Sequence, residues 1–172
     1  MNVIAAHARL AALVADIAAA IRGHAGEDRA RAVAVAIAPY AADPLLLAGR
    51  ACPCDPTRYV RHLLHEDAAR CWALAALVWR PGQMSPVHAH KAWCAVGFHR
   101  GVLAETFYAP GTGAPVPTGI VLRHPGDISH GPACPDAIHR LANLGTDVAI
   151  SIHAYGLAYD RFCTDLNLIH AG

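Results

Sequence analysis

Two histidines one residue apart, His88 and His90, constrain the fold of this chain more than any other feature of its sequence. They lie in a segment that runs from Gly82 to Gly101, and a third histidine, His139, follows far downstream. Side chains alternate between the two faces of a β-strand, so histidines at i and i+2 project from the same face. Two such histidines and a distant third predict three neutral imidazoles around one metal ion, which is typical of first-row metals with open positions for small ligands.

The length and composition of the chain indicate one globular domain. At 172 residues it falls in the usual single-domain range of roughly 100–200 residues. Apolar residues make up 55% of the sequence, which is enough for a core, and charged residues only 16%, without the high net charge of a disordered chain. The formal net charge is +1 and no basic stripe is visible, so we expect no nucleic-acid partner.

The apolar run from Leu10 to Ile21 could be mistaken for a signal peptide or a membrane span. Asp16 interrupts it, and it is too short to cross a bilayer, which takes about 20 apolar residues. We therefore expect a cytoplasmic protein with no membrane segment. The six cysteines fit neither a disulfide framework nor the CxxC spacing of a zinc site, which agrees with a reducing compartment.

Residues 1–55 are rich in alanine and have the periodicity of helices. Apolar residues at intervals of three and four form one helix face, made of Leu10, Leu13, Val14, Ile17 and Ile21. Gly23 and Gly26 end this helix. A second helix is expected over 27–39, and a short third one from Asp43-Pro44, because proline is tolerated in a first turn. We predict that this helical segment packs on the rest of the molecule as a lid or brace.

From about residue 56 the pattern changes to short strands separated by turn residues. The predicted strands are Tyr59–His65, Cys71–Trp79, Cys94–Arg100, Leu103–Tyr108, Ile120–Arg123, Ile138–Asn143 and Ala149–Tyr155. Many short, regularly spaced strands predict a sandwich or a small barrel. We therefore expect an all-β core over residues 56–172, with Cys71 buried in it, that forms a single domain with the helical segment.

The segment that carries the first two histidines resembles the first motif of the cupin superfamily, Gly-x5-His-x-His-x3-acid-x6-Gly. Its glycine and histidine positions are occupied by Gly82, His88, His90 and Gly101. The second cupin motif is approximated by Pro125-Gly126-Asp127 and by His139 followed by Asn143. The two motifs stand in the right order with β-rich sequence between them. The resemblance implies a cupin-type small β-barrel, or jelly roll.

Position 94 departs from that motif, because most cupins have a metal-binding glutamate there and this chain has Cys94. A metal site made only of histidines carries no ligand charge, unlike a site with two histidines and a carboxylate. Such a neutral site can accept an anionic thiolate substrate without an excess of negative charge on the metal. Cys94 could alternatively be a fourth ligand, since thiolates bind these metals well.

Over roughly residues 56–163 the chain resembles the thiol dioxygenases of the cysteine dioxygenase type. In that family three histidines hold ferrous iron, and here His88, His90 and His139 match them. A segment of the family around the third ligand is matched by residues 138–143. The resemblance implies Fe(II) as cofactor, with a small-molecule thiol and O2 as the partners.

A second segment of that family, Ser-x-His-x-Tyr, is intact as Ser151, His153 and Tyr155. Alternation along one strand places the three side chains on one face, where a hydroxyl, an imidazole and a phenol can form a hydrogen-bonded relay. The resemblance implies that they are catalytic and that the phenol lies near the iron. In the animal enzymes a cysteine becomes thioether-linked to this tyrosine, so we hypothesise a crosslink between Cys94 and Tyr155.

Substrate choice is predicted to depend on Arg61, with Tyr59 beside it. In cysteine-selective members an arginine at this position pairs with the substrate carboxylate, and in mercaptopropionate-selective members a glutamine replaces it. A guanidinium can bind a carboxylate through two parallel hydrogen bonds, which fixes orientation as well as charge. The alternatives are a surface arginine at a sheet edge, or Arg161 as the carboxylate anchor.

These features predict a non-haem iron(II) thiol dioxygenase that oxidises a small carboxylate-bearing thiol, with cysteine favoured, to its sulfinate. The nearest alternative is the same chemistry on 3-mercaptopropionate, mercaptosuccinate or another thiol, which Trp93 favours because a tryptophan precedes the equivalent position in the bacterial mercaptopropionate-type enzymes. An alternative from another class is a non-oxidative metal-binding cupin, such as a sugar isomerase or a binding module. The sequence leaves both monomer and homodimer open.

Overall fold

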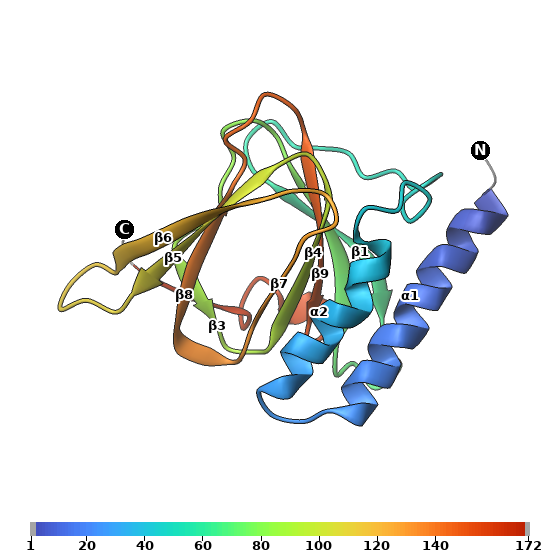
Figure 1. Ribbon diagram of the computed structural model, residues 1–172, viewed down its shortest axis with the longest axis horizontal. Coiled ribbons are helices and arrows are strands. Elements are labelled where there is room, and N and C mark those ends of the chain that lie inside the picture. The colour runs from blue at the N-terminus through green and yellow to red at the C-terminus, as the bar shows by residue number, and fades with distance from the viewer. Residues whose placement is uncertain (1–2, 171–172) are drawn as a thin grey trace.

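The computed structural model describes residues 3–170, which form two facing antiparallel sheets with two helices outside them (Figure 1). The first sheet has the order β1 (Val60–Glu66), β2 (Ala73–Trp79), β9 (Ala149–Tyr155), β4 (Cys94–Arg100) and β7 (Ile128–Gly131). The second sheet has the order β10 (Asn167–Ile169), β3 (His88–His90), β8 (Cys134–Ala142), β5 (Leu103–Ala109) and β6 (Val116–Arg123). A short 3-10 helix, Tyr159–Arg161, precedes β10.

The central strands of the first sheet are buried on both faces, and this determines where their side chains point. In β2, Leu77 and Trp79 join the apolar cluster between the sheets, whereas Leu74 and Val78 join the cluster beneath the helices. The period of two in a strand requires this division. The same alternation in β9 turns Ile152 toward the helices. Its neighbours at odd-numbered positions therefore face the interior of the barrel.

The helices α1 (Val3–Gly23) and α2 (Asp28–Ala41) cover the outer face of the first sheet (Figure 1). Their fully buried residues, such as Leu13 and Ile37, pack on that sheet and bury its apolar outer positions. Gly97 in β4 allows this close approach, because a Cβ there would collide with the Ile37 side chain. The helices thus pack on the barrel as a brace. The division of the chain at residue 55 stays a prediction.

The predicted third helix at Asp43-Pro44 is wrong, because this segment forms a succession of turns. The Asp43 carboxylate accepts a hydrogen bond from the Leu45 amide at 2.9 Å, and the Asp43 carbonyl accepts one from the Leu46 amide at 3.0 Å. Aspartate side chains commonly cap turns in this way. Gly49 then adopts a φ of 75°, which a continuing helix does not allow.

The predicted strand Cys71–Trp79 begins two residues later than expected, at Ala73. The Asp67 carboxylate accepts hydrogen bonds from the amides of Cys71 and Trp72 at 2.7 and 2.8 Å, which holds the preceding residues in a turn. Cys71 is consequently exposed, so its predicted burial is wrong. A side chain that satisfies the backbone in this way competes with the strand ladder.

Several strand boundaries follow the sequence pattern and others do not. Cys94–Arg100 and Ala149–Tyr155 have the predicted bounds, whereas β6 and β8 each begin four residues before their predicted starts. The short strands β7 and β10 were not predicted at all. Their few residues carry too little alternation to be recognised, and they are strands because neighbouring strands pair with them.

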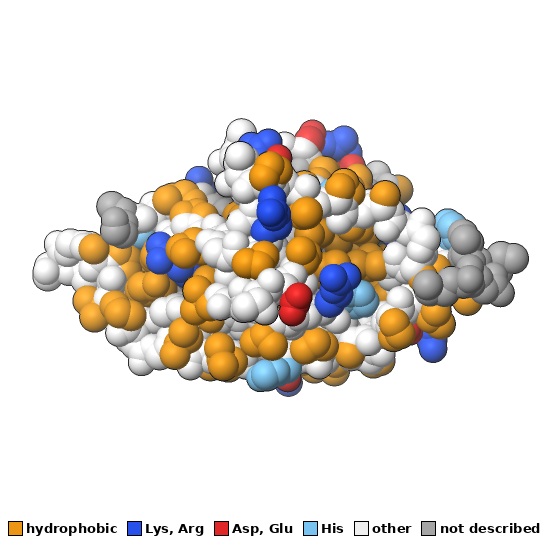
Figure 2. All heavy atoms as spheres, turned by 90° about the horizontal axis from the view of Figure 1, so that it is seen from above, with side chains coloured by type: hydrophobic (Ala, Val, Ile, Leu, Met, Phe, Trp, Pro, Cys, Tyr) orange, Lys and Arg blue, Asp and Glu red, His pale blue; other side chains and the backbone are white. Residues whose placement is uncertain are grey.

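The surface carries few charged groups. On the face shown in Figure 2, lysine and arginine side chains lie apart from one another among apolar side chains. Among the residues that the structure describes, neither helix combines the length and apolarity needed to cross a membrane.

Candidate metal centre

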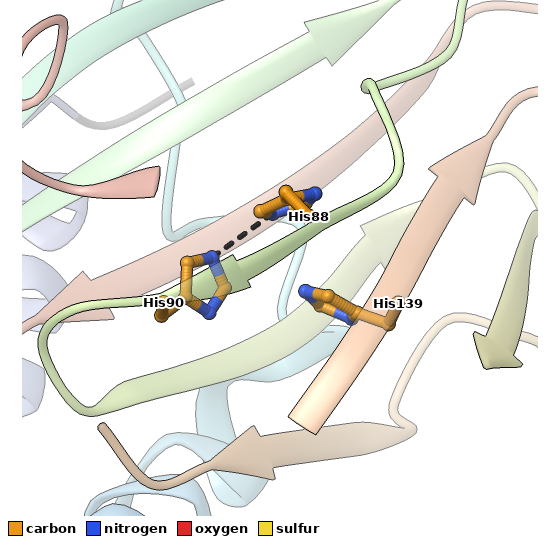
Figure 3. Close-up of side chains that lie close together, drawn as sticks. All are labelled: His88, His90 and His139. Atoms are coloured by element: carbon orange, nitrogen blue, oxygen red, sulfur yellow. Dashed lines mark hydrogen bonds between the residues drawn. The ribbon is translucent and has the colours of Figure 1, made fainter. Parts of the chain in front are cut away.

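Three histidine side chains converge inside the barrel from two adjacent strands of the second sheet (Figure 3). His88 and His90 project from β3, and His139 projects from β8, where it pairs in register with His88. One ring nitrogen from each of the three lies within 4.8 Å of the others. The relative exposure of His88 and of His90 is 6%, so both are shielded from bulk water. The structure therefore brings together the three residues that the sequence predicts as ligands.

The hydrogen bonds of two of these rings determine which nitrogen faces the centre. His88 Nδ1 donates to the Pro86 carbonyl at 2.9 Å, and His139 Nδ1 donates to the Glu105 carboxylate at 3.0 Å. In a neutral imidazole the other nitrogen then carries a lone pair. His139 Nε2 is buried and has no hydrogen-bond partner among residues 3–170, while His88 Nε2 and His90 Nε2 are hydrogen-bonded to each other at 3.0 Å. The unpartnered lone pair of His139, next to two ring nitrogens in such close contact, fits a bound cation.

Burial keeps the histidines of β3 unprotonated at neutral pH. Burial, followed by repulsion from His139, lowers the pKa of His88 from 6.5 to about 3. Burial and repulsion from His88 and His139 lower the pKa of His90 well below its ordinary value. A buried imidazole loses the water that would solvate its charged form, which explains the direction. Neutral imidazole is the form that binds metals.

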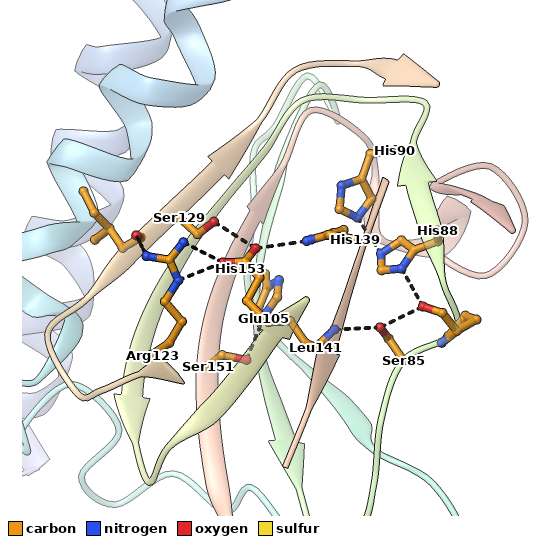
Figure 4. Close-up of polar contacts among 12 residues, drawn as sticks. Ser85, His88, His90, Glu105, Arg123, Ser129, His139, Leu141, Ser151 and His153 are labelled. Atoms are coloured by element: carbon orange, nitrogen blue, oxygen red, sulfur yellow. Dashed lines mark hydrogen bonds and ion pairs between the residues drawn. The ribbon is translucent and has the colours of Figure 1, made fainter. Parts of the chain in front are cut away.

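Glu105, on β5, is a member of the site that the sequence analysis missed (Figure 4). Its relative exposure is 1%, and its carboxylate contacts His139, Arg123 and Ser129. Burial by itself raises the pKa of Glu105, but the hydrogen bond from His139 and the charge of Arg123 outweigh burial and lower it. The available signal was an acidic residue in a predicted strand, at a position that shares a face with Leu103 and Phe107.

The three residues of the predicted relay lie on the inner face of β9 and are joined by hydrogen bonds. Ser151 Oγ lies 2.8 Å from His153 Nε2, and His153 Nδ1 lies 2.8 Å from the Tyr155 hydroxyl. At the far end, Trp79 Nε1 donates to Ser151 Oγ at 2.9 Å. Burial, followed by the charge of Arg61, lowers the pKa of His153 well below its ordinary value, so the ring is neutral.

The hydrogen bonds of this relay are all donated in the same direction along the strand. An indole N–H can only donate, so Ser151 Oγ accepts from Trp79. Ser151 is fully buried, and the remaining acceptor for its proton is His153 Nε2. His153 Nδ1 must then carry the proton of the neutral ring and donate it to the Tyr155 oxygen. The Tyr155 hydroxyl proton is therefore not donated to His153, and the phenol also forms a hydrogen bond with the neighbouring Cys94 thiol.

Tyr155 lies between the relay and the triad. Its ring centroid is 5.5 Å from that of His90, and in register it is opposite Cys94 on β4. Burial, then the charge of Glu105, raises the pKa of the Cys94 thiol, and burial, then Cys94, raises the pKa of Tyr155 well above 10. Both groups are protonated at neutral pH. The cluster of ligand atoms contains the three histidines and not the Cys94 thiol, which argues against a fourth ligand.

Arg61, on β1, approaches the triad from a different cavity than Glu105 does. Its Nη2 donates to the Tyr59 hydroxyl at 3.0 Å, and Tyr59 stacks on Trp79 with ring centroids 4.3 Å apart. The Arg61 Nε is buried and has no hydrogen-bond partner in residues 3–170. Arg61 and Tyr59 line a cavity of about 10 Å³ together with the triad, His153 and Tyr155. Arg161, in contrast, is exposed and paired with Asp165, outside this cavity.

A second cavity, of about 150 Å³, reaches the triad from the other side. His90 and His139 line both cavities, whereas Glu105, Cys94 and Ser129 line only this one. The candidate metal centre therefore separates a narrow, arginine-lined space from a wider one.

Two facing antiparallel sheets around an inward-facing histidine cluster define a cupin barrel, and solved structures agree with that class. The protein TT1209 from Thermus thermophilus matches with a TM-score of 0.50 and 17% identity, over 62% of this chain and 90% of that one. A cupin 2 conserved barrel domain protein from Rhodopseudomonas palustris matches with a TM-score of 0.50 and 19% identity, over 66% and 68%. These likenesses concern the fold, and they confirm the predicted barrel.

The family is more specific than the fold. The model of the family described as cysteine dioxygenase type I matches residues 1–164, and the chain belongs to this family. The predicted resemblance is confirmed, and it extends further than expected, because the match includes the N-terminal helices as well as residues 56–163. The chain is thus a thiol dioxygenase of the cupin type, with a cluster of three histidines that could hold a metal ion.

Proposed function

We propose that this protein is an iron(II) thiol dioxygenase whose substrate is a small carboxylate-bearing thiol, with cysteine favoured. The observation that carries the proposal is the convergence of His88, His90 and His139 beside a buried serine–histidine–tyrosine relay, in a member of the cysteine dioxygenase type I family. Iron(II), when bound by these histidines, would supply adjacent positions for sulfur and O2 and the electron transfer that inserts both oxygen atoms into the thiol to give a sulfinate.

Arg61 is the proposed anchor for the substrate carboxylate. Its buried Nε has no hydrogen-bond partner among the residues that the structure describes, although a guanidinium donor in such a place normally has one. A carboxylate could accept from Nε and from one hydrogen of Nη2, while the other hydrogen of Nη2 is donated to the Tyr59 hydroxyl. The narrow cavity restricts the substrate to a small thiol. Arg61 and Tyr59 would thereby orient the sulfur toward the histidines.

Tyr155 is the proposed donor to the reacting groups. Hydrogen bonds are donated in sequence from the Trp79 indole to Ser151, from Ser151 to His153 and from His153 to the Tyr155 oxygen, so the phenol proton is not used within the relay. Burial raises the pKa of Tyr155 well above 10, so the phenol keeps that proton at neutral pH. His153 and Ser151 would hold the phenol in position. A tyrosine without these partners would lose conformational entropy each time it adopted the reactive orientation.

The same arrangement accommodates other small thiols, including 3-mercaptopropionate and mercaptosuccinate, because the Arg61 contact requires only a carboxylate. The substrate charge suits this centre in every case. Three neutral imidazoles carry no ligand charge, so a thiolate can bind without crowding negative charge on the metal. A non-oxidative cupin, such as a sugar isomerase or a binding module, would have no evident use for the Tyr155 relay.

Oxygen uptake by iron(II)-loaded protein tests the proposal most directly. Cysteine and 3-mercaptopropionate are offered in parallel, and the sulfinate product is quantified. We expect uptake matched by sulfinate with at least one thiol, and none with a His139→Ala variant. Uptake without sulfinate, or equal uptake by the variant, would contradict the proposed chemistry. The thiol that is oxidised faster shows whether the substrate is cysteine or 3-mercaptopropionate, which lacks the amine.

A further inference from the structure

We infer that Glu105 is a positioning residue of the metal centre, which acts through His139 and fixes that ring with Nε2 directed at the metal. This inference rests on the proposed function, because it concerns the same three-histidine site. Most cupins have a carboxylate at position 94, where this chain has Cys94. Glu105 instead places a carboxylate next to the centre, with the His139 imidazole between it and the position of the metal. The metal would then keep its open positions, because Glu105 would act through His139, and Arg123 balances the carboxylate charge.

The strand register places Glu105 beside His139. On the paired strands β5 and β8, Glu105 is opposite Leu141 and His139 is opposite Phe107, so the two polar residues are diagonal neighbours on one face. Glu105 Oε1 lies 3.0 Å from His139 Nδ1. An ionised carboxylate can only accept, so Nδ1 must donate and Nε2 is left with its lone pair. Nε2 is buried and has no hydrogen-bond partner within the described part of the chain.

The carboxylate is held in this position from two further strands (Figure 4). Arg123 on β6 directs both Nε and Nη2 at Glu105 Oε2, each at 2.8 Å, and Ser129 on β7 donates to Oε1 at 3.0 Å. Arg123 also donates to the Ile128 carbonyl at 3.4 Å. The two carboxylate oxygens of Glu105 therefore have different partners, because Oε2 contacts the positively charged Arg123 and Oε1 contacts His139, the proposed metal ligand.

If Glu105 only formed a structural ion pair with Arg123, its second oxygen would not need to contact His139. A buried salt bridge contributes little to stability compared with apolar residues of similar volume. Glu105 and Arg123 would satisfy each other without His139, yet Oε1 is directed at the one atom whose protonation determines which nitrogen binds the metal. The Nδ1 of His88 donates to a neutral carbonyl, whereas the Nδ1 of His139 donates to a charged carboxylate. The His139 ring is therefore more strongly polarised than the His88 ring.

Replacement of Glu105 by glutamine gives a directional prediction. Arg123 requires an acceptor, so the amide oxygen of Glu105→Gln should turn to Arg123 and the amide nitrogen should face His139. His139 Nδ1 would then have to accept, and the proton would move to Nε2, the metal-binding atom. We expect zinc affinity to fall by about 10–100-fold, the usual effect of losing such an outer partner. In Glu105→Gln/Arg123→Met the amide is free to turn back, and part of the affinity should return.

The experiment measures zinc(II) affinity by competition with a chromophoric chelator, and the His139 tautomer by ¹⁵N NMR of the metal-free protein. The matched control is Asp16→Asn, which removes a carboxylate that accepts from Tyr40 in the helices. Wild type and the control should show the Nδ1–H tautomer and equal affinity. Glu105→Gln should show the Nε2–H tautomer and weaker binding.

The outcomes separate this inference from the proposed function. If the wild type binds zinc no better than His139→Ala, the metal centre itself is wrong. If the wild type binds zinc but Glu105→Gln binds it equally, with Nδ1–H retained, the role of Glu105 is overturned. Should the glutamine variant fail to fold, the wild-type spectrum alone decides, because an Nε2–H tautomer for His139 contradicts the inference.

Discussion

Cys94 and Tyr155 are direct cross-strand partners on β4 and β9, and their side chains interact inside the barrel. The relative exposures of the two are 2% and 3%, so neither group is open to solvent. Two side chains opposite each other on antiparallel strands have Cβ atoms about 4.5–5.5 Å apart, which is a distance that a thiol and a phenol ring can bridge. This pairing gives the hypothesis of a thioether crosslink a structural basis.

We expect turnover with a thiol substrate and O2 to convert part of the protein to the crosslinked form. The Cys94 sulfur would bond to a ring carbon beside the Tyr155 hydroxyl, the S–H and C–H hydrogens would be lost, and O2 would be the oxidant. Peptide mapping by mass spectrometry should find the two peptides joined and lighter by two hydrogens. Cys94→Ser should give no such species, and a free Cys94 thiol after extensive turnover would count against the link.

Tyr155→Phe should slow turnover without loss of metal. The phenol proton is the one relay proton that no other relay member accepts, and a hydrogen bond from it to a charged reacting group is worth about 1.5–3 kcal/mol, or roughly 10–100-fold in rate. The measurement pairs kcat with zinc(II) affinity. A variant with weakened metal binding and normal kcat per bound metal would instead make Tyr155 a structural support for His90.

Arg61→Gln should lower kcat/KM for carboxylate-bearing thiols by about 10–100-fold, because a charged hydrogen bond worth about 1.5–3 kcal/mol is lost. Most of the change should be in KM, since the carboxylate is bound equally in ground and transition states. Arg161→Gln is the matched control, because this exposed arginine pairs with Asp165 and does not line the cavity. Equal losses in both variants, or none in Arg61→Gln, would remove Arg61 as the anchor.

The neutral, buried His153 should make the metal-free protein less stable as the pH falls below 6.5. The folded-state pKa of His153 is lowered well below 6.5, so above that pH neither state binds the proton and His153 has no effect. Below it the unfolded chain takes up a proton that the folded chain cannot, and the free energy of unfolding falls by at most about 1.4 kcal/mol per pH unit.

Denaturant unfolding at several pH values between about 6.5 and 5 measures this effect. The slope of unfolding free energy against pH should be shallower in His153→Gln than in the wild type. His124→Gln, which alters an exposed histidine, should keep the wild-type slope. If His153→Gln keeps it as well, His153 is protonated inside the folded protein and the direction assigned to the relay is wrong.

The sequence alone was sufficient for features that depend on local periodicity. The alternation in Ser151-x-His153-x-Tyr155 requires one shared face, and the spacing of His88 and His90 requires another, whatever the partner strands are. The bounds of β4 and β9 followed for the same reason. Asp43 and Asp67 mark the limit of that reasoning, because their side chains satisfy backbone amides and replace a predicted helix and strand start with turns.

Only the tertiary structure determined which distant residues meet. The sequence predicted His139 as the third ligand, but nothing near it indicated Glu105, whose proposed role depends on the register between β5 and β8. The direction of the Tyr155 relay likewise depends on Trp79, which the pairing of β2 with β9 brings to Ser151. A strand pattern determines which face a side chain occupies, whereas strand order and register determine its neighbours, and those arise from the packing of the whole barrel.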